Sequence, residues 1–412
     1  MVEIFQNICK IYTLKIFFSL IFSLAMLTGF AQKKDNRITI GTVDTVYSNI
    51  LKEKRAVYIH VPEGDKNEHF PVLYILDGET HFQSAVAIVE QISGIVPNMV
   101  IVGICNTDRE RDLTPTHVKP DRIINAGDAA KSGGGENFMG FIEKELIPYV
   151  DAHYPTTTYR VFSGHSLGGL TVVNAFFNHT NLFKAYIAID PSLWWDGEGW
   201  IKKQEAGLLQ RDFSGRSLFV AMANNIPVGM DTVSLMKDTA LIAPVTHAVF
   251  PFIQFLRSAK PPGLYFGSKF YPNEWHGSVE LNAEYDALRY IFNFFRFDMN
   301  YVRAHPELSP DSLINVHFNE VSKQMGYQVL PTEDMINDMA YGYMSMQRMN
   351  YAYALFKRNI ENHPGSSNAW DSFGDYYVAA GDKQKAMEAY EKSLNLQETS
   401  DTRRKFEELK RK

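Results

Sequence analysis

A serine between two glycines is the part of this chain whose spacing most directly suggests chemistry. Gly164-His165-Ser166-Leu167-Gly168 follows a run, 160–164, that reads as a short strand, and precedes small and apolar residues, 167–177, that read as a helix. A Gly-x-Ser-x-Gly sequence between a strand and a helix is typical of a nucleophile elbow, whose serine has a strained backbone. A Cβ two residues away on either side would clash there. We therefore predict that Ser166 is a nucleophile; a glycine-rich turn that only caps a helix is the alternative.

A histidine much later in the chain is placed to serve this serine. His276 lies in a loop that follows a predicted strand, 264–270, and precedes a predicted helix, 279–297. When a nucleophile elbow is present, the order along the chain is serine, acid, histidine. We predict that His276 takes the proton from Ser166 and passes it to the leaving alcohol. A solvated loop histidine is the alternative. His165, beside the serine, is interpreted as a packing residue or as one that forms a local hydrogen bond.

Three carboxylates compete for the position beside His276. The acid is expected after the strand that ends near Ala223, and Asp231 and Asp238 both lie downstream of it. Asp231 is the nearer one and follows a glycine-containing turn, so we assign it as the acid. Asp238, Glu274 and a serine–histidine dyad without an acid stay open, and each carboxylate could also be a solvated loop charge.

Two backbone N–H groups must face the reacting carbonyl, because negative charge develops on its oxygen. The elbow supplies the N–H of Leu167. The second N–H is expected from the loop after the predicted strand 72–76, where Gly78 allows the backbone to approach closely. We predict that the amides of Gly78 and Glu79 complete this oxyanion hole.

Strand and helix patterns alternate through about the first 300 residues. Continuous apolar strands separated by helices predict a mostly parallel sheet with helices on both faces, the α/β class. The predicted strands are 56–61, 72–76, 99–104, 160–164, 185–189, 218–223 and 264–270, and the predicted helices are 136–149, 167–177 and 279–297.

Five segments carry ordered motifs, namely 72–78, 106–115, 164–169, 190–195 and 274–278. At these motifs, over about residues 38–298, the chain resembles the esterase D-like branch of the α/β-hydrolases, the serine esterases related to enterochelin and feruloyl esterases. The resemblance implies an α/β-hydrolase fold with Ser166 as nucleophile and His276 as general base. The family's Gly-x-x-Glu-like segment after the seventh strand is here Asn224-Asn225-Ile226-Pro227, so the resemblance leaves the acid open.

Three side chains near predicted strand ends are candidates for contact with a substrate. Arg109 could hold an acidic group of the substrate through charge-assisted hydrogen bonds. We prefer the alternative that arginines and aspartates of this segment pair with each other and shape the loop. Trp194 and Trp195 could form an aromatic wall for an acyl or aryl group, or pack at the rim of the site.

Residues 1–31 predict a secretory signal peptide, with a basic region, a short apolar core and small residues before the cleavage point. These parts are Lys10 and Lys15, the run 16–27, and Gly29 and Ala31. The apolar run is shorter than the ~20 residues that a membrane-spanning helix needs. We therefore expect an exported, periplasmic or secreted protein without stable membrane insertion after cleavage.

The composition excludes several other classes of protein. A net charge of −6 without a basic cluster disfavours a nucleic acid partner. Beyond the predicted signal peptide the chain keeps one cysteine, Cys105, so no disulfide within the chain is expected. The sequence has no metal-binding or dinucleotide motif, and we expect neither a metal nor a cofactor.

The last part of the chain repeats at a spacing of 34 residues, pairing Ile336 with Trp370, Ala340 with Gly374, Tyr343 with Tyr377, Ala352 with Ala386 and Phe356 with Tyr390. This period resembles tetratricopeptide repeats, each of which is a pair of helices. Two repeats are fewer than the three usually needed to stand alone. We therefore expect 331–412 to dock on the hydrolase domain, 32–300, through a linker or helix in 301–330. A groove that binds a protein partner is the alternative.

These features favour an exported serine hydrolase that cleaves carboxylic esters of a small-molecule or oligomeric substrate. One alternative is an acyltransferase, because hydrolysis and transfer share the same acyl-serine. The other is a catalytically weak binding protein whose repeats recruit a partner.

Overall fold

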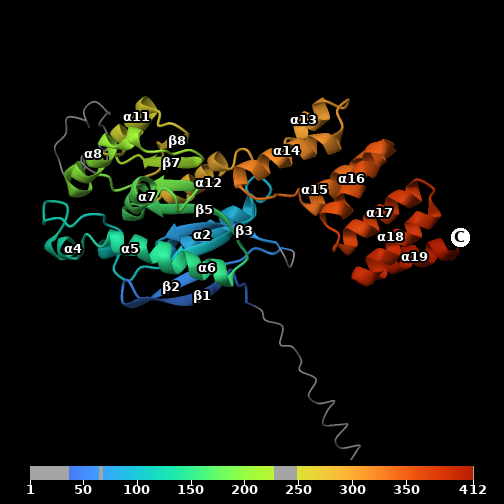
Figure 1. Ribbon diagram of the computed structural model, residues 1–412, viewed down its shortest axis with the longest axis horizontal. Helices are drawn as coiled ribbons and strands as arrows, with labels where there is room; N and C mark the ends of the chain where they lie inside the picture. Colours follow the sequence, from blue (N-terminus) through green and yellow to red (C-terminus); the bar gives the residue numbers. More distant parts are fainter. Residues whose placement is uncertain (1–36, 65–67, 227–247, 412) are drawn as a thin grey trace, which may run out of the picture. The chain divides into compact units, whose positions relative to one another are not determined.

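The computed structural model describes residues 37–64, 68–226 and 248–411. Within these residues, eight strands form one sheet in the order β1-β2-β4-β3-β5-β6-β7-β8 (Figure 1). The strands are β1 (Thr42–Ser48), β2 (Glu53–His60), β3 (Phe70–Leu76), β4 (Val100–Ile104), β5 (Thr156–His165), β6 (Ala185–Ile189), β7 (Arg216–Ala223) and β8 (Leu264–Tyr271). The pairings β1–β2 and β2–β4 are antiparallel, and the other pairings are parallel. The mostly parallel sheet predicted from the sequence is confirmed.

Helices cover both faces of the sheet, so the strands β3, β4 and β6 are buried along their whole length. In β3, Leu73 and Ile75 pack in one core cluster, which includes helices α2 (Gly78–Gln91) and α12 (Val279–Ile291). Val72, Tyr74 and Leu76 pack in the other cluster. That cluster is covered by α5 (Gly135–Phe141), α6 (Ile147–His153), α7 (Leu167–Asn178), α8 (Gly199–Ala206) and α11 (Val249–Ala259) (Figure 1).

Several elements differ from those predicted from the sequence, and helices α2, α8 and α11 were not predicted. Strand β1 was not predicted, because it lies at the edge of the sheet and most of its side chains are exposed or half-buried. The helix predicted at 136–149 is a continuous helical stretch that contains a π-helical segment, Ile142–Leu146. The helix predicted at 279–297 ends at Ile291, because the phenylalanines that follow it pack in two separate clusters instead of continuing a helical face.

The C-terminal region is helical, with α13 (Met299–Ala304), α14 (Pro310–Met325), α15 (Glu333–Ser345), α16 (Met349–Asn362), α17 (Ser367–Ala379), α18 (Lys383–Leu396) and α19 (Ser400–Arg411). The bounds of α15 and α16 recur in α17 and α18 after 34 positions, from 333 to 367, 345 to 379, 349 to 383 and 362 to 396. Two of the repeated positions, Gly374 in α17 and Tyr390 in α18, lie against each other, because a Cβ on Gly374 would stand 2.4 Å from the ring of Tyr390.

Helix α14 contributes to two separate cores. Its Val321 and Met325 belong to the cluster of the sheet, α2 and α12. Its Ile314 belongs to the cluster of the repeated helices, together with Ile336 and Phe356. The predicted signal peptide lies outside the described residues. Among the residues that the structure describes, no helix combines the length and the apolar character needed to cross a lipid bilayer.

Candidate active site

Ser166 occupies a sharp turn between β5 and α7. Its φ is 61° and its ψ is −118°, values that are strained for a residue with a side chain. A Cβ on Gly164 would stand 2.6 Å from the carbonyl group of Gly168, so the backbone can cross here only if position 164 is glycine. The turn places Ser166 at the carboxyl end of β5, where the sequence predicted a nucleophile.

His276 brings together one hydroxyl and one carboxylate. Its Nε2 lies 3.0 Å from Ser166 Oγ, and its Nδ1 lies 2.6 Å from Oδ2 of Asp190. The backbone N–H of His276 donates to Oδ1 of Asn225 at 2.9 Å, which fixes the loop that carries the histidine. A serine, a histidine and a carboxylate in this order can move a proton from the hydroxyl and stabilise the resulting imidazolium.

Asp190 directly follows β6 and is 5% exposed. The backbone N–H of Ala223 donates to its Oδ1 at 3.0 Å, and Nδ2 of Asn225 donates to its Oδ2 at 2.9 Å. Burial alone would raise the pKa of this carboxyl, but the hydrogen bonds from His276, Ala223 and Asn225 outweigh it and hold the pKa below its ordinary value. Asp190 is therefore ionised beside the imidazole at neutral pH.

The carboxylate that contacts His276 is not one of those considered from the sequence. Asp231 and Asp238 lie outside the described residues. Glu274 accepts hydrogen bonds from Ser278 and Asn282, and the structure gives it no hydrogen bond to the imidazole of His276. The acid was expected after β7, whereas Asp190 follows β6. An aspartate at the end of the apolar strand next to the elbow strand was the signal that could have found it.

Two further side chains lie against the pair of Ser166 and His276. Oγ of Ser192 is 3.3 Å from Oγ of Ser166, and the backbone N–H of Ser192 donates to the carbonyl of Ser166 at 3.0 Å. The ring of His165 packs on the ring of His276, as expected for a packing residue. Burial lowers the pKa of His165 to about 4, so its ring is neutral at pH 7.

The predicted oxyanion-hole residues stand at the starts of two helices. Leu167 is the first residue of α7, and Gly78 and Glu79 are the first two residues of α2. The first N–H groups of a helix have no partner within the helix, so they are available to an anion. A Cβ on Gly78 would stand 2.5 Å from the backbone of Gly103, so the start of α2 packs directly on β4.

The two tryptophans differ in their surroundings. Trp195 is 2% exposed, belongs to the hydrophobic core, and its Nε1 donates to the carbonyl of Thr116 at 3.3 Å. The core encloses the ring of Trp195, which favours the alternative of packing over an aromatic substrate wall. Trp194 is half-buried and packs against the same core, with its ring centre 5.9 Å from that of Trp195.

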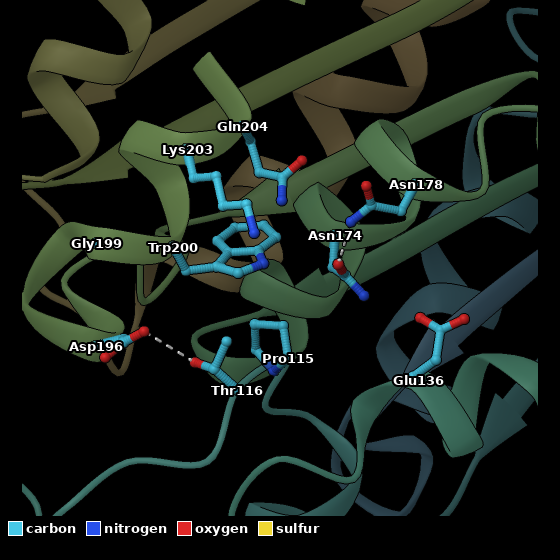
Figure 2. A pocket seen from close by; sticks show the side chains of 10 residues that line it. All are labelled: Pro115, Thr116, Glu136, Asn174, Asn178, Asp196, Gly199, Trp200, Lys203 and Gln204. Atoms are coloured by element: carbon cyan, nitrogen blue, oxygen red, sulfur yellow. Dashed lines mark hydrogen bonds between the residues drawn. The ribbon is translucent and has the colours of Figure 1, made fainter. Parts of the chain in front are cut away.

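A pocket of about 350 Å³ lies beside the C-terminal half of α7 (Figure 2). Its lining is largely polar, with Asn174 and Asn178 from α7 and Trp200, Lys203 and Gln204 from α8. None of the residues that contact Ser166 or His276 is part of this lining. The pocket is therefore separate from the candidate active site.

The guanidinium of Arg109 pairs with the carboxylate of Asp77, the residue directly before Gly78 and Glu79. Its Nε donates to Oδ1 of Asp77 at 2.7 Å, and its Nη2 donates to Oδ2 at 2.9 Å. The partner of Arg109 is thus an aspartate, but it lies outside the segment 106–115, within which we expected the pairing.

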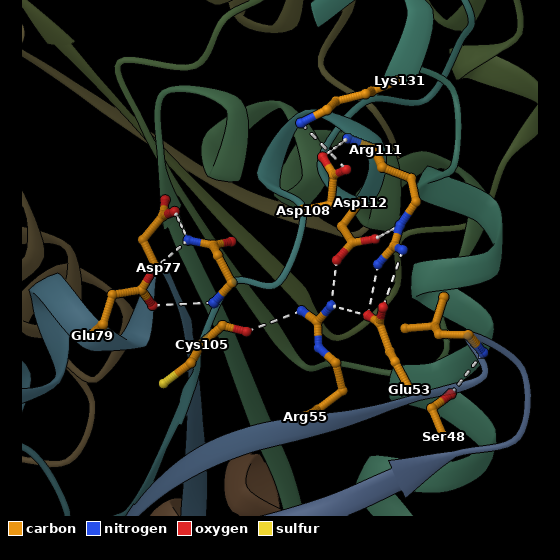
Figure 3. A network of polar contacts seen from close by, with 12 residues as sticks. Ser48, Glu53, Arg55, Asp77, Glu79, Cys105, Asp108, Arg111, Asp112 and Lys131 are labelled. Carbon is orange, nitrogen blue, oxygen red and sulfur yellow. Dashed lines mark hydrogen bonds and ion pairs between the residues drawn. The ribbon is translucent and has the colours of Figure 1, made fainter.

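Arg111, on the same short helix α3 (Arg109–Asp112), belongs to a second network of ion pairs. It donates to Glu53 and to Asp112, and Arg55 joins the same two carboxylates (Figure 3). These contacts tie the loop after β4 to strand β2, whereas Arg109 ties it to α2.

With the elbow, the histidine and the carboxylate in place, comparison with known proteins places the chain. Residues 48–216 match the model of the Esterase family, which is described as "Putative esterase". An IroE-like serine hydrolase from Shewanella oneidensis, whose crystal structure is known, is 30% identical, with a TM-score of 0.66 over 78% of this chain and 99% of that one. The chain belongs to the α/β-hydrolase esterases.

Two curated relatives of this esterase act on siderophores according to their names. The ferri-bacillibactin esterase BesA of Bacillus subtilis is 33% identical over 33% of this chain and 52% of the relative. The siderophore triacetylfusarinine C esterase of Aspergillus fumigatus is 31% identical over 31% of this chain and 45% of the relative. The chain thus matches about half the length of these relatives.

Proposed function

We propose that this esterase cleaves carboxylic esters through an acyl-Ser166 intermediate. His276 Nε2 accepts the hydroxyl proton while Ser166 Oγ attacks the ester carbonyl. The bond to the alcohol oxygen then breaks, and His276 returns the proton to that oxygen. In the second half, a water molecule attacks the acyl-serine and gives its proton to His276. The carboxylic acid leaves, and Ser166 regains its proton.

Asp190 is the acid of this mechanism. Its contact with Nδ1 of His276 keeps the proton on Nδ1, so Nε2 is the basic atom that faces Ser166. Its negative charge stabilises the imidazolium that forms in each half of the reaction. The N–H groups of Leu167, Gly78 and Glu79 stabilise the oxyanion of each tetrahedral intermediate.

The observation that carries this proposal is the continuous hydrogen-bonded series from Ser166 through His276 to Asp190. It is tested with p-nitrophenyl esters of increasing acyl length and with a fluorophosphonate probe, with the Ser166→Ala variant as blank. We expect hydrolysis of short-chain esters and labelling of Ser166 alone. A folded wild-type protein that neither labels nor hydrolyses any ester would refute the proposal.

The substrate class that the relatives favour is an ester-linked siderophore. The names of the two curated relatives describe a ferri-bacillibactin esterase and a siderophore triacetylfusarinine C esterase, and this chain matches a family of esterases. The test compares kcat/KM for ferri-bacillibactin and triacetylfusarinine C with that for p-nitrophenyl acetate. A siderophore value below that of the aryl ester would argue for another natural substrate.

We also propose that the chain is exported and that its repeated helices are tetratricopeptide-like. The basic, apolar and small residues of 1–31 support export. The 34-residue recurrence of two helix pairs supports the repeat type. Cell fractionation with a blot for the mature chain tests export, because retention of the full-length protein in the cytoplasm would contradict it.

A further inference from the structure

The single residue between β3 and α2 has an unusual backbone. Asp77 adopts the left-handed conformation, with φ of 53° and ψ of 45°, and is 5% exposed. Aspartate tolerates this conformation better than most residues, but it is still strained and must be held by its surroundings. The conformation turns the chain directly from the strand into the helix whose first N–H groups belong to Gly78 and Glu79.

Side chains from the loop after β4 hold this turn. Arg109 makes the bidentate contact with the carboxylate of Asp77 described above. Nδ2 of Asn106 donates to Oδ1 of Asp77 at 2.6 Å and to Oε1 of Glu79 at 2.8 Å. The start of α2 is therefore fixed through two acidic side chains, Asp77 directly before the helix and Glu79 in its first turn, which Figure 3 shows side by side.

Asp77 and Arg109 also lie against the elbow. A Cβ on Gly168 would stand 3.3 Å from Oδ2 of Asp77, so this oxygen lies against the turn that contains Ser166. Nη2 of Arg109 lies 3.5 Å from the carbonyl oxygen of His165. Arg109 and Asp77 thus contact both of the backbone segments that supply the oxyanion hole.

The charge of Asp77 matters because of this position. Burial would raise its pKa, but the contacts with Arg109 and Asn106 outweigh burial and lower the pKa, so the carboxylate is ionised at neutral pH. A buried carboxylate beside the elbow repels a developing oxyanion, and this repulsion is strong where water is excluded. The guanidinium of Arg109 cancels that charge.

We propose that Arg109 is a positioning residue for ester hydrolysis. Acting through Asp77, it aims the N–H groups of Gly78 and Glu79 at the oxyanion and neutralises the carboxylate next to them. This inference rests on the proposed function, and it assigns Arg109 no contact with the substrate.

The test measures kcat and KM of the full-length protein with p-nitrophenyl acetate. Removal of one oxyanion-hole donor lowers kcat by about 10²–10³-fold in other enzymes, so we expect Arg109→Gln to lower kcat by about 100-fold and to leave KM within about twofold. The double variant Asp77→Asn/Arg109→Gln should recover part of this loss, because it removes the uncompensated charge. Added guanidinium should also raise kcat of Arg109→Gln but not of the wild type.

Arg111→Gln is the matched control, because it breaks an ion-pair network on the same short helix but not the contact with Asp77. It should lower the melting temperature and leave kcat unchanged. Equal losses of kcat in Arg109→Gln and Arg111→Gln would overturn the inference, since loop stability would then explain both. A raised KM with normal kcat in Arg109→Gln would also overturn it, because Arg109 would then bind the substrate.

Failure of this inference is distinct from failure of the proposed function. If the wild type neither labels with fluorophosphonate nor hydrolyses the ester, the proposed function fails. If the wild type does both and Arg109→Gln keeps a normal kcat, only the positioning role fails. Should Arg109→Gln not fold, Arg109→Lys replaces it, because lysine keeps the positive charge but cannot form the bidentate contact with Asp77.

Discussion

The ring centre of His165 lies 4.5 Å from that of His276, with the planes tilted by 41°. The ring centre of His165 also lies 6.1 Å from that of His81, which belongs to α2. His165 therefore packs against both the proposed general base and the helix that supplies part of the oxyanion hole. Because burial keeps its ring neutral, its contribution is packing and not charge.

Replacement of His276 by alanine should lower kcat by several orders of magnitude, because no other base lies within hydrogen-bonding distance of Ser166 Oγ among the described residues. Replacement of His165 by glutamine should cost far less. Both variants are compared with the wild type in the p-nitrophenyl acetate assay, with circular dichroism to verify folding. A His276→Ala variant with near-normal turnover would show that the base lies elsewhere.

Replacement of Asp190 by asparagine should lower kcat by about 10⁴-fold, the loss seen when the equivalent aspartate of a serine protease is changed. Asparagine keeps the shape of the side chain, but its amide can donate a hydrogen bond to Nδ1 of His276. The ring proton then lies on Nε2, the nitrogen that must accept the proton of Ser166. Asp231→Asn and Asp238→Asn are measured alongside. A larger loss in either of them than in Asp190→Asn would assign the acid to the segment after β7.

The parts of this site that lie close together in the sequence could be predicted from it. Ser166 and its glycines form one local turn, and β3 and β6 are buried on both faces, so their apolar runs are continuous. The contact between Asp190 and His276 joins residues 86 positions apart and depends on how two loops meet. The role of Arg109 likewise depends on a partner, Asp77, that lies 32 positions away. No local pattern contains such contacts.

A buried glutamate beneath the elbow should make stability depend on pH. Glu284 of α12 is fully buried and accepts a hydrogen bond from Ser163 of β5, and its other carboxyl oxygen has no hydrogen-bond partner among the described residues. Burial, with the nearby charge of Glu280, raises its pKa to about 8, although Ser163 and His81 of α2 act in the opposite direction.

A raised folded-state pKa means that the folded protein holds a proton that the unfolded chain releases. The contribution of Glu284 is therefore fully present below its ordinary pKa and is lost as the pH rises toward about 8. The loss approaches about 1.4 kcal/mol per pH unit within that window. Glu284→Gln cannot ionise, so its free energy of unfolding should fall less between pH 5 and pH 8 than that of the wild type.

Urea unfolding at pH 5, 6, 7 and 8 measures this difference. Ser163→Ala is the matched control, because it removes the hydrogen bond but keeps the ionisable group, so its pH dependence should persist. Parallel curves for the wild type and Glu284→Gln would contradict the raised pKa.

Deletion of residues 331–412 should destabilise the remaining protein without abolishing its chemistry. The deletion removes the helices against which Ile314 of α14 is buried, while Val321 and Met325 of the same helix stay packed on the hydrolase core. Burial of one such side chain contributes roughly 1.5–3 kcal/mol, so its exposure should lower the melting temperature by several degrees. Every proposed catalytic group lies before residue 280, and the truncated protein should still label at Ser166. Thermal unfolding of the two proteins side by side decides the matter. An unchanged melting temperature would mean that the repeated helices form an independent arm, and it would favour recruitment of a partner over stabilisation.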